Sequence, residues 1–394
     1  MSPAPPLHVA VVGAGAFGGW TALWLRRRGC RVTLIDAWGP GNSRASSGGE
    51  SRVIRGIYGP DQVYIQWVAR SFEVWAESEK RWGRRLYHPT GALWMFSVED
   101  SYARSSIPHL LEAGLPVSEI SLGEARARFP QINFQGIRTV FFEERAGWLA
   151  ARRACRVVAE AFVSEGGEYR EATARPGEIR NGRMERLELS DGQALQADAY
   201  VFACGPWLGR LFPDAVGDAI LPTRQDVLFF GTPIGDPRFS EGTIPIWIEF
   251  GERFFYGIPG NDHRGFKVAD DTRGEPFDPT SGDRTPLPES IARARSYLAL
   301  RFPALAGAPL VEARVCQYEN SPDGHFLVDR HPEAGNVWLL GGGSGHGFKL
   351  GPALGEHAAG LVLGDGEPLP RFALARLAGA SGPLKTQFVS GETS

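Results

Sequence analysis

The feature that most limits how this chain can fold is a glycine pattern near its N-terminus, where residues 13–18 read Gly-Ala-Gly-Ala-Phe-Gly. An apolar run over residues 8–12 precedes the pattern and suits a strand that is buried on both faces. Helical spacing follows over residues 17–28, and a second strand is expected over residues 31–36. This order predicts a βαβ unit, and therefore a fold of mixed α/β class with a parallel sheet.

Each part of this pattern has a physical role in binding a dinucleotide. Gly13 allows a tight turn, Gly15 lets the backbone approach a pyrophosphate, and Gly18 lets the helix pack closely on the strand. The start of the helix offers unpaired N–H groups to the phosphates. Asp36, about 20 residues further on, would accept hydrogen bonds from ribose hydroxyls. The pattern does not separate FAD from NAD. The predicted cofactor contacts in this segment are Gly13, Ala14, Gly15, Ala16, Phe17, Gly18 and Asp36.

Length and composition exclude several classes of protein. A chain of 394 residues is long enough for two or three domains, on the usual scale of roughly 100–200 residues each. The formal net charge is −3, and Lys and Arg are scattered along the chain, so nothing indicates a nucleic acid or an anionic membrane as a partner. The 4 cysteines are far apart, which suits a reducing compartment. We expect a cytoplasmic protein with a small-molecule partner and no metal site.

The pattern of strands changes along the chain. Aromatic-rich strands over residues 225–269 show no alternation with helices, whereas strands over residues 326–340 lead through a glycine turn into a helix near residues 350–363. We therefore predict a discontinuous, Rossmann-like nucleotide-binding domain and a substrate domain built on a mainly antiparallel sheet. The predicted boundaries are 1–88, 148–218 and 316–380 for the first domain, 89–147 and 219–315 for the second, and 381–394 for a C-terminal tail.

Other elements follow from local patterns. Apolar residues at helical spacing predict helices over residues 63–82 and 148–162, and residues 92–96 read as a strand. Residues 39–49 are rich in Gly, Ser and Asn and are expected to form a loop. The pair Asp191-Gly192 predicts a hairpin turn between strands.

Four stretches of the chain carry a resemblance to a known family. They are residues 13–18; Ser51-Arg52-Val53-Ile54-Arg55 with Tyr58; Cys316-Gln317-Tyr318 with Asp323-Gly324-His325-Phe326; and Gly343-Ser344-Gly345-His346-Gly347-Phe348-Lys349. Together they resemble the D-amino-acid-oxidase-type flavoproteins, and within them the branch of monomeric sarcosine oxidase and N-methyltryptophan oxidase. The likeness covers most of the chain, and its last stretch is the most specific. It implies that the dinucleotide is FAD.

The resemblance assigns roles to four side chains. The family cysteine of the Cys-x-Tyr strand carries the flavin, which implies a thioether bond between Cys316 and FAD; a buried, inert cysteine is the alternative. The resemblance also implies that Arg52 lies against the isoalloxazine ring. It further implies that Arg55 and Lys349 pair with a substrate carboxylate. On residue type alone, the two arginines would pass for a solvated loop pair and the lysine for a surface residue.

The glycine-rich stretch before the last helix is the other implied cofactor contact. Its N–H groups and the positive helix end would face the flavin pyrimidine ring, which gains negative charge on reduction. A flexible turn with a packed histidine is the alternative. The residues implied to touch the cofactor here and in the second stretch are Ser51, Gly343, Ser344, Gly345, His346, Gly347 and Lys349.

A lysine and two tyrosines complete the implied catalytic site. Lys267 matches a family lysine that speeds the reaction with oxygen, since a fixed ammonium stabilises superoxide; an exposed strand lysine is the alternative. Tyr256 and Tyr318 match positions that line the substrate cavity. The chain departs from the branch at Asp271, where a histidine is common, and this carboxylate could hold a cationic group of a larger substrate. Aromatic residues that would suit an apolar substrate, or only the core, are Trp247, Phe250 and Phe254.

These predictions describe a monomeric FAD-dependent oxidase of a secondary amine, such as an N-methyl or cyclic amino acid, that reduces oxygen to hydrogen peroxide. Three alternatives remain at this point. The same fold could serve a dehydrogenase with another electron acceptor. The nucleotide site could belong to a binding module without turnover, or to an NAD-dependent dehydrogenase.

Overall fold

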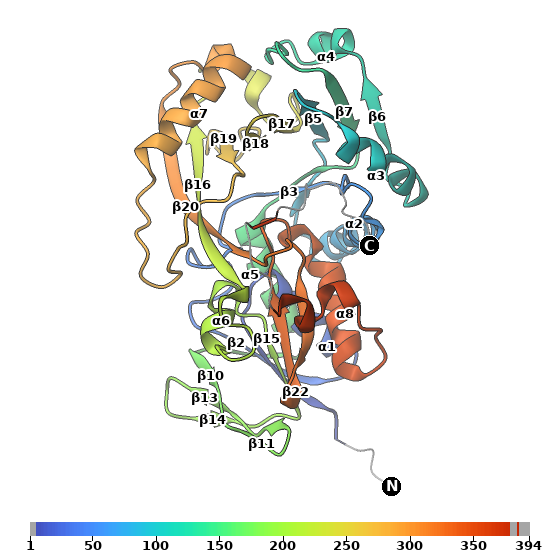
Figure 1. The fold of residues 1–394 in the computed structure, drawn as a ribbon, viewed down its shortest axis with the longest axis vertical. Coiled ribbons are helices and arrows are strands. Elements are labelled where there is room, and N and C mark those ends of the chain that lie inside the picture. The colour runs from blue at the N-terminus through green and yellow to red at the C-terminus, as the bar shows by residue number, and fades with distance from the viewer. Residues whose placement is uncertain (1–4, 379–383, 386–394) are drawn as a thin grey trace.

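The computed structural model describes residues 5–378 and 384–385. The molecule has two parts that follow one another along its longest axis (Figure 1). A six-stranded sheet lies in the lower part of this view, and an eight-stranded sheet lies in the upper part. Helices accompany both sheets, so the predicted α/β class is confirmed.

The N-terminal pattern forms the predicted βαβ unit. It consists of β1 (His8–Val12), α1 (Ala16–Arg27) and β2 (Arg31–Asp36). The two strands pair in parallel, with Val9 opposite Val32. Their apolar side chains are buried, as expected for strands that are covered on both faces.

The six-stranded sheet joins segments that are far apart in the sequence. Its strands, in order across the sheet, are β21 (Leu327–His331), β22 (Ala334–Gly341), β15 (Ala199–Phe202), β1, β2 and β9 (Glu168–Glu171). β15 is parallel to both β1 and β22, whereas β21 is antiparallel to β22. The last helix, α8 (Gly351–Leu363), packs on α1, where Gly355 lies against Trp20. Strands from the start and from the last third of the chain therefore form one sheet.

The eight-stranded sheet is almost entirely antiparallel. Its strands, in order, are β20 (Leu310–Asn320), β16 (Leu221–Phe230), β19 (Phe266–Asp270), β18 (Phe254–Ile258), β17 (Ile246–Phe250), β5 (Ala92–Phe96), β7 (Thr139–Glu143) and β6 (Val117–Ile120). Only the pairing of β17 with β5 is parallel. Trp247 is buried in the core of this part, stacked near Phe266 and Tyr297, so it does not line a substrate site.

One predicted helix starts later than expected. The helix predicted over residues 148–162 is α5 (Ala151–Ser164), because the preceding residues form β8 (Gly147–Leu149). This strand pairs with β3 (Arg52–Ile54) and β4 (Tyr87–His88), an association that local spacing does not encode. The predicted helix over residues 63–82 is confirmed as α2 (Gln62–Trp82). The other α-helices in the described residues are α3 (Ser101–Glu112), α4 (Leu122–Arg128), α6 (Leu208–Leu211) and α7 (Pro288–Arg301).

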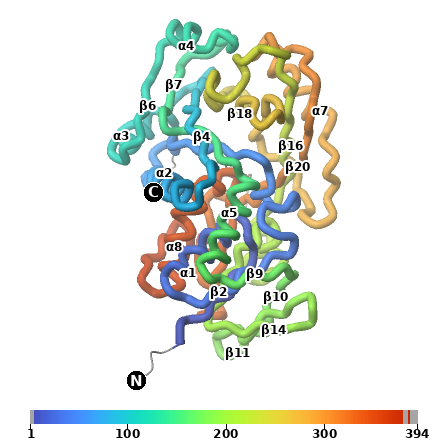
Figure 2. The backbone as a smooth tube through the Cα atoms, turned by 180° about the vertical axis from the view of Figure 1, so that it is seen from behind, coloured from blue at the N-terminus to red at the C-terminus, as the bar shows by residue number. Residues whose placement is uncertain are grey.

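Short hairpins form the end of the molecule that is furthest from the eight-stranded sheet (Figures 1 and 2). The turn predicted at Asp191-Gly192 joins two of their strands, and Leu187 pairs with Leu195 across it. The strands of this region are β10 (Ala174–Pro176), β11 (Ile179–Arg180), β12 (Arg183–Met184), β13 (Leu187–Leu189) and β14 (Ala194–Leu195).

The domain boundaries stay a prediction. β20 runs without a break across the predicted boundary at residues 315 and 316, so Cys316 lies on the eight-stranded sheet. The predicted tail, residues 381–394, lies outside the described residues except for residues 384–385. Among the helices of the described chain, none is both long and apolar enough to cross a membrane.

Candidate active site

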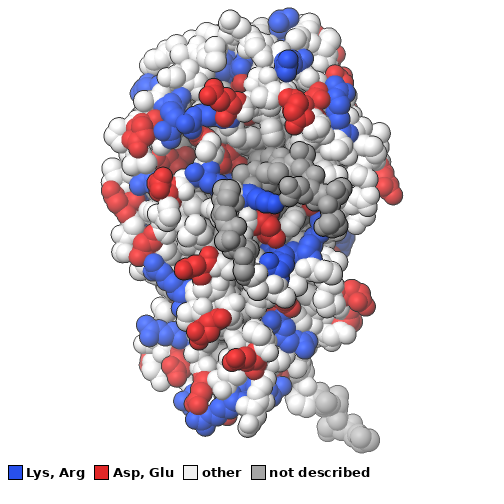
Figure 3. Space-filling model, viewed as in Figure 1, with Lys and Arg blue, Asp and Glu red and all other residues white. Residues whose placement is uncertain are grey.

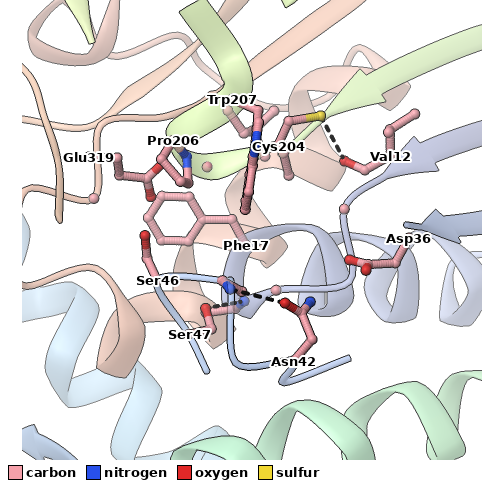
Figure 4. Close-up of a pocket in the computed structure, with 18 of the residues that line it drawn as sticks. Val12, Phe17, Asp36, Asn42, Ser46, Ser47, Cys204, Pro206, Trp207 and Glu319 are labelled. Atoms are coloured by element: carbon pink, nitrogen blue, oxygen red, sulfur yellow. Dashed lines mark hydrogen bonds between the residues drawn. The ribbon is translucent and has the colours of Figure 1, made fainter. Parts of the chain in front are cut away.

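A long cavity lies at the carboxyl ends of the parallel strands, where ligands bind in open α/β sheets (Figure 4). The ends of β1, β2, β15 and β22 contribute to its wall, and β20 of the other sheet contributes the opposite wall. Asp36 and Glu319 stand at opposite sides of the view in Figure 4, with the ring of Phe17 between them. The cavity therefore extends from the βαβ unit toward the eight-stranded sheet.

Close backbone contacts explain two of the three glycines at the start of α1. Gly13 has a φ angle of +103°, and a Cβ atom there would lie 2.3 Å from the carbonyl oxygen of Ala203. A Cβ atom on Gly18 would lie 1.9 Å from the carbonyl oxygen of Gly13. Gly15 is different, because the atom nearest to its Cβ position is Ser47 Oγ at 3.3 Å. Gly15 lines the cavity, and its small size leaves room for a ligand.

Asp36 is fixed at the end of β2 by backbone groups. Its Oδ2 accepts a hydrogen bond from Ala14 N at 2.7 Å, and its Oδ1 accepts one from Trp38 N at 3.0 Å. Burial raises the pKa of this carboxyl. The side chain lines the cavity, as its predicted role requires.

At the other end, three predicted residues from three strands converge. Arg52 Nη2 donates to the carbonyl oxygen of Ser46 at 2.7 Å and lies 3.2 Å from Cys316 Sγ. Lys267 is 1% exposed, and its Nζ donates to the carbonyl oxygen of Ser51 at 3.0 Å. Burial, together with the charge of Arg52, lowers the pKa of Lys267 to about 7. Arg52 lines the cavity, whereas Cys316 and Lys267 contact Arg52 and Ser51 without being among the residues that line it.

A smaller pocket adjoins this end and shares Arg52 and Tyr318 with the cavity. Two further cations stand on its wall, Arg55 at 3% and Lys349 at 4% exposure. Lys349 Nζ donates to the carbonyl oxygen of His346 at 2.9 Å. Burial and the nearby Arg55 charge lower the pKa of Lys349 well below its usual value. The pocket thus brings two buried basic side chains together on one wall.

Asp271 brings a negative group into the same pocket. Its Oδ1 accepts a hydrogen bond from the Tyr318 hydroxyl at 2.5 Å, and its Oδ2 lies 3.9 Å from Arg273 Nη1. Burial raises the pKa of Asp271. Tyr256 and Phe254 complete this side of the pocket. The chain's departure from the family pattern therefore lies directly on the pocket wall.

The glycine-rich stretch forms a tight turn between β22 and α8. Ser344 has a φ angle of +45°, which is uncommon for a residue with a side chain, and its Oγ donates to the carbonyl oxygen of Gly342 at 2.9 Å. His346 uses both ring nitrogens within the protein: Nε2 bonds to the carbonyl oxygen of Gly324 at 3.0 Å and Nδ1 to the Tyr58 hydroxyl at 3.1 Å. Burial lowers its pKa well below the usual value, so His346 is neutral and packed while it lines the pocket.

The sequence did not single out several residues that line the cavity. Ser47 Oγ accepts a hydrogen bond from Ala16 N, at the first residue of α1, over 3.1 Å, and Ser47 also lines the cavity. Glu319 lies next to the predicted Tyr318, and the cavity also includes Trp207. In the sequence, only the Ser/Asn-rich composition of residues 39–49 pointed to Ser47. Glu319 and Trp207 had no such indication, because which residues line a cavity depends on tertiary contacts.

The described residues on the face shown in Figure 3 form no basic patch, whereas several basic side chains are gathered at the pocket. Basic and acidic side chains are interspersed over that face, with no continuous area of either sign. The buried basic residues Arg55, Lys267 and Lys349, together with the half-buried Arg52, contrast with this mixed surface. Such an arrangement suits a small anionic ligand enclosed by the protein.

Comparisons with known proteins agree over nearly the whole chain. Residues 8–361 match the sequence profile of the FAD dependent oxidoreductase family. Monomeric sarcosine oxidase of Streptomyces avermitilis is 30% identical over 95% of this chain and 99% of that protein. N-methyl-L-tryptophan oxidase of Yersinia pestis is 26% identical over 93% and 98%. The crystal structure of L-proline dehydrogenase from P. horikoshii has a TM-score of 0.82 at 21% identity, covering 94% of this chain and 98% of that one.

Proposed function

Because the chain belongs to the FAD dependent oxidoreductase family, we propose that it oxidises a secondary amine that carries a carboxylate. N-methyl and cyclic amino acids are the expected substrates, and the product is an imine that water hydrolyses. The observation that carries the proposal is the pocket in which the buried side chains of Arg55 and Lys349 stand beside the long cavity. We expect the protein to act as a monomer in the cytoplasm.

The residues that line the long cavity fit FAD. The glycine turn and the start of α1 suit a pyrophosphate, and Asp36 suits a ribose diol. Two buried oxygen atoms of the cavity lining, Ser46 Oγ and Glu319 Oε2, have no hydrogen-bond partner in the described chain, so they are available to a ligand. When bound, FAD supplies the site with an acceptor for a hydride equivalent.

The pocket would orient the substrate by charge. Arg55 and Lys349 would hold the carboxylate through charge-assisted hydrogen bonds, which are strong in an enclosed site. Asp271, bonded to Tyr318, would face the nitrogen side of the substrate or a second cationic group. The amine must be neutral to release its electrons, and an enclosed pocket with several cations lowers the pKa of a bound ammonium.

Lys267 supports oxygen as the electron acceptor. Its buried ammonium lies beside Arg52, where developing negative charge on oxygen would be stabilised. We expect uptake of oxygen with one hydrogen peroxide per substrate oxidised. A dehydrogenase that uses another acceptor is the alternative, and it predicts substrate-dependent dye reduction with little oxygen uptake.

The contact between Arg52 and Cys316 supports a covalent flavin. Arg52 Nη2 lies 3.2 Å from Cys316 Sγ, so the sulfur that would attack a flavin carbon stands beside the guanidinium that is expected to contact the ring. After acid precipitation, we expect the yellow flavin to remain in the precipitate of the unsubstituted protein. In Cys316→Ala, we expect it to be released into the supernatant. Colour that is released from the unsubstituted protein would contradict the covalent bond without affecting the fold assignment.

Anaerobic reduction of the flavin tests the proposed activity most directly. The protein would be mixed with N-methyl and cyclic amino acids and with the matching decarboxylated amines, and bleaching of the flavin absorbance would be followed. We expect bleaching by some of the acids, with binding at least about tenfold weaker for the amines, because each charge-assisted hydrogen bond contributes about 1.5–3 kcal/mol. Arg55→Met should reduce that preference. Bleaching by none of the panel would contradict the proposal.

A further inference from the structure

Glu319 is a buried carboxyl whose position no predicted role explains. It lies on β20 beside Tyr318, is 8% exposed, and lines the long cavity (Figure 4). A Cβ atom on Gly343 would lie 2.8 Å from Glu319 Oε1, and one on Gly205 would lie 3.3 Å from Oε2. Both neighbours are glycines, so the backbone closes tightly around the carboxyl group. Among the described residues, Oε2 has no hydrogen-bond partner.

The surroundings of this carboxyl favour its neutral form. Burial raises the pKa of Glu319 to about 8, and only the N–H of Gly343 opposes that shift. The charged and titratable groups near it are Arg52 and Tyr318 on the same cavity wall and Cys204 after β15, whose own pKa is raised by burial. None of these groups forms an ion pair with Glu319 in the described chain. A protonated carboxyl carries an O–H donor, and a buried donor without an acceptor is costly.

The place of Glu319 along the cavity indicates what its partner is. Asp36 and the start of α1 suit the ribose and pyrophosphate of a dinucleotide, whereas Arg52 and Cys316 mark the end where the flavin ring is expected. Glu319 contacts the glycine turn, since its carbonyl oxygen accepts a hydrogen bond from Ser344 N at 3.0 Å, and it stands across the view from Asp36 in Figure 4. Beyond the ribose that Asp36 would hold, FAD carries hydroxyl, phosphate and flavin carbonyl oxygens, all of which are hydrogen-bond acceptors.

We propose that Glu319 is a cofactor-binding residue whose protonated carboxyl group donates a hydrogen bond through Oε2 to an oxygen atom of FAD. This rests on the proposed function only for the identity of the cofactor. The hydrogen bond satisfies the one side-chain oxygen of Glu319 that the protein leaves without a partner. Since the ionised carboxylate cannot donate, FAD affinity is coupled to the protonation of this residue.

The test measures FAD binding to apoprotein in a Cys316→Ala background, in which the cofactor is exchangeable. Binding would be followed by quenching of FAD fluorescence for the background, Glu319→Gln, Glu319→Met and the control Glu312→Gln, which lies on the same strand outside the cavity. At about pH 6, Glu319→Gln keeps an N–H donor and should bind within about threefold, whereas Glu319→Met should bind about tenfold more weakly. The control should match the background.

The pH dependence separates a bond to the cofactor from a purely structural role. Because only the protonated form donates, affinity in the background should fall as pH rises through about 8. Glu319→Gln should show no such fall, and Glu312→Gln should show the full fall. Thermal unfolding of each apoprotein would confirm that the variants are folded.

Two results overturn the proposal. One is equal FAD affinity in the background and in Glu319→Met, and the other is the same loss of affinity with pH in Glu319→Gln. Folded apoprotein that binds no FAD under any condition would reject the proposed function as well. Normal FAD binding that is insensitive to every Glu319 variant would reject only the role of this residue.

Discussion

The two ends of the long cavity are built in different ways. At the nucleotide end, the wall includes the backbone of the glycine turn after β1, and close contacts at Gly13 and Gly18 exclude any larger residue there. At the substrate end, the wall consists of side chains such as Arg52, Arg55 and Lys349, which come from β3, from the residue after it and from the segment before α8. Ligand binding at the nucleotide end therefore depends on shape, whereas binding at the substrate end depends on charged side chains that are shielded from water.

This difference predicts that the two ends affect the folding stability of the empty protein differently. Backbone N–H groups at a helix start are polar without carrying a full charge, so the glycine turn itself adds little unfavourable electrostatic energy. Buried cations lose their hydration, and the lowered pKa values of Lys267 and Lys349 show that the protein destabilises their charged forms. We infer that the substrate end lowers the stability of the empty protein, and that ligand binding offsets this.

The largest expected effect lies at the nucleotide end, in Gly18→Ala. Its new Cβ would sit 1.9 Å from the carbonyl oxygen of Gly13, so β1 and α1 must separate, at an expected cost of about 3 kcal/mol or more. Gly15→Ala is the matched control, because its nearest neighbour would be Ser47 Oγ at 3.3 Å. We expect the control to fold with depleted flavin. Chemical denaturation and flavin content measure both effects, and equal stability of the two variants would break the comparison.

The second prediction concerns Lys267→Met, which should stabilise the apoprotein at neutral pH. The folded pKa of about 7 lies below the usual 10.5, so between these values the unfolded chain binds more protons and wild-type stability rises with pH. Below pH 7 the penalty is complete, and the variant should gain on the order of a few kcal/mol. That gain should vanish as pH approaches 10.5. Urea unfolding across this range measures it.

If the difference in unfolding free energy between wild type and Lys267→Met did not change with pH, burial would not destabilise the charged form of Lys267. In the holoprotein, the same substitution should slow reoxidation of reduced flavin by oxygen and leave its anaerobic reduction by substrate largely unchanged. Stopped-flow absorbance separates the two steps. Equal slowing of both would contradict a specific role with oxygen.

The same contrast explains what the sequence could predict. The βαβ unit and Asp36 are local: spacing within one segment fixes them, and the structure places each as expected. The substrate end became predictable only through family resemblance, since Cys316 meets Arg52 across 264 residues. Nothing in its own segment marks Glu319, because its burial results from the packing of β20 against distant glycine turns. For Trp247 the sequence left both a substrate contact and the core open, and the structure places it in the core.

The smallest expected effect, and the sharpest test of charge against shape, is Asp271→Asn. Asparagine keeps an acceptor for the Tyr318 hydroxyl and nearly the same volume, so only the charge is removed. Because Asp271 lies on the wall with two buried cations, its removal should tighten binding of a simple N-methyl amino acid severalfold or leave it unchanged. A substrate with a second basic group should bind about tenfold more weakly.

Anaerobic titration of the flavin spectrum with each ligand measures these affinities, and Asp270→Asn, whose carboxylate pairs with Arg253 on the exposed side, is the control. If the affinity of one ligand rises and that of the other falls, the charge of Asp271 acts inside the pocket. A change in the shape of the pocket would weaken the binding of both ligands. Weaker binding of both classes would mean that Asp271 acts by holding Tyr318 in place, and the substrate end would then depend on shape as the nucleotide end does.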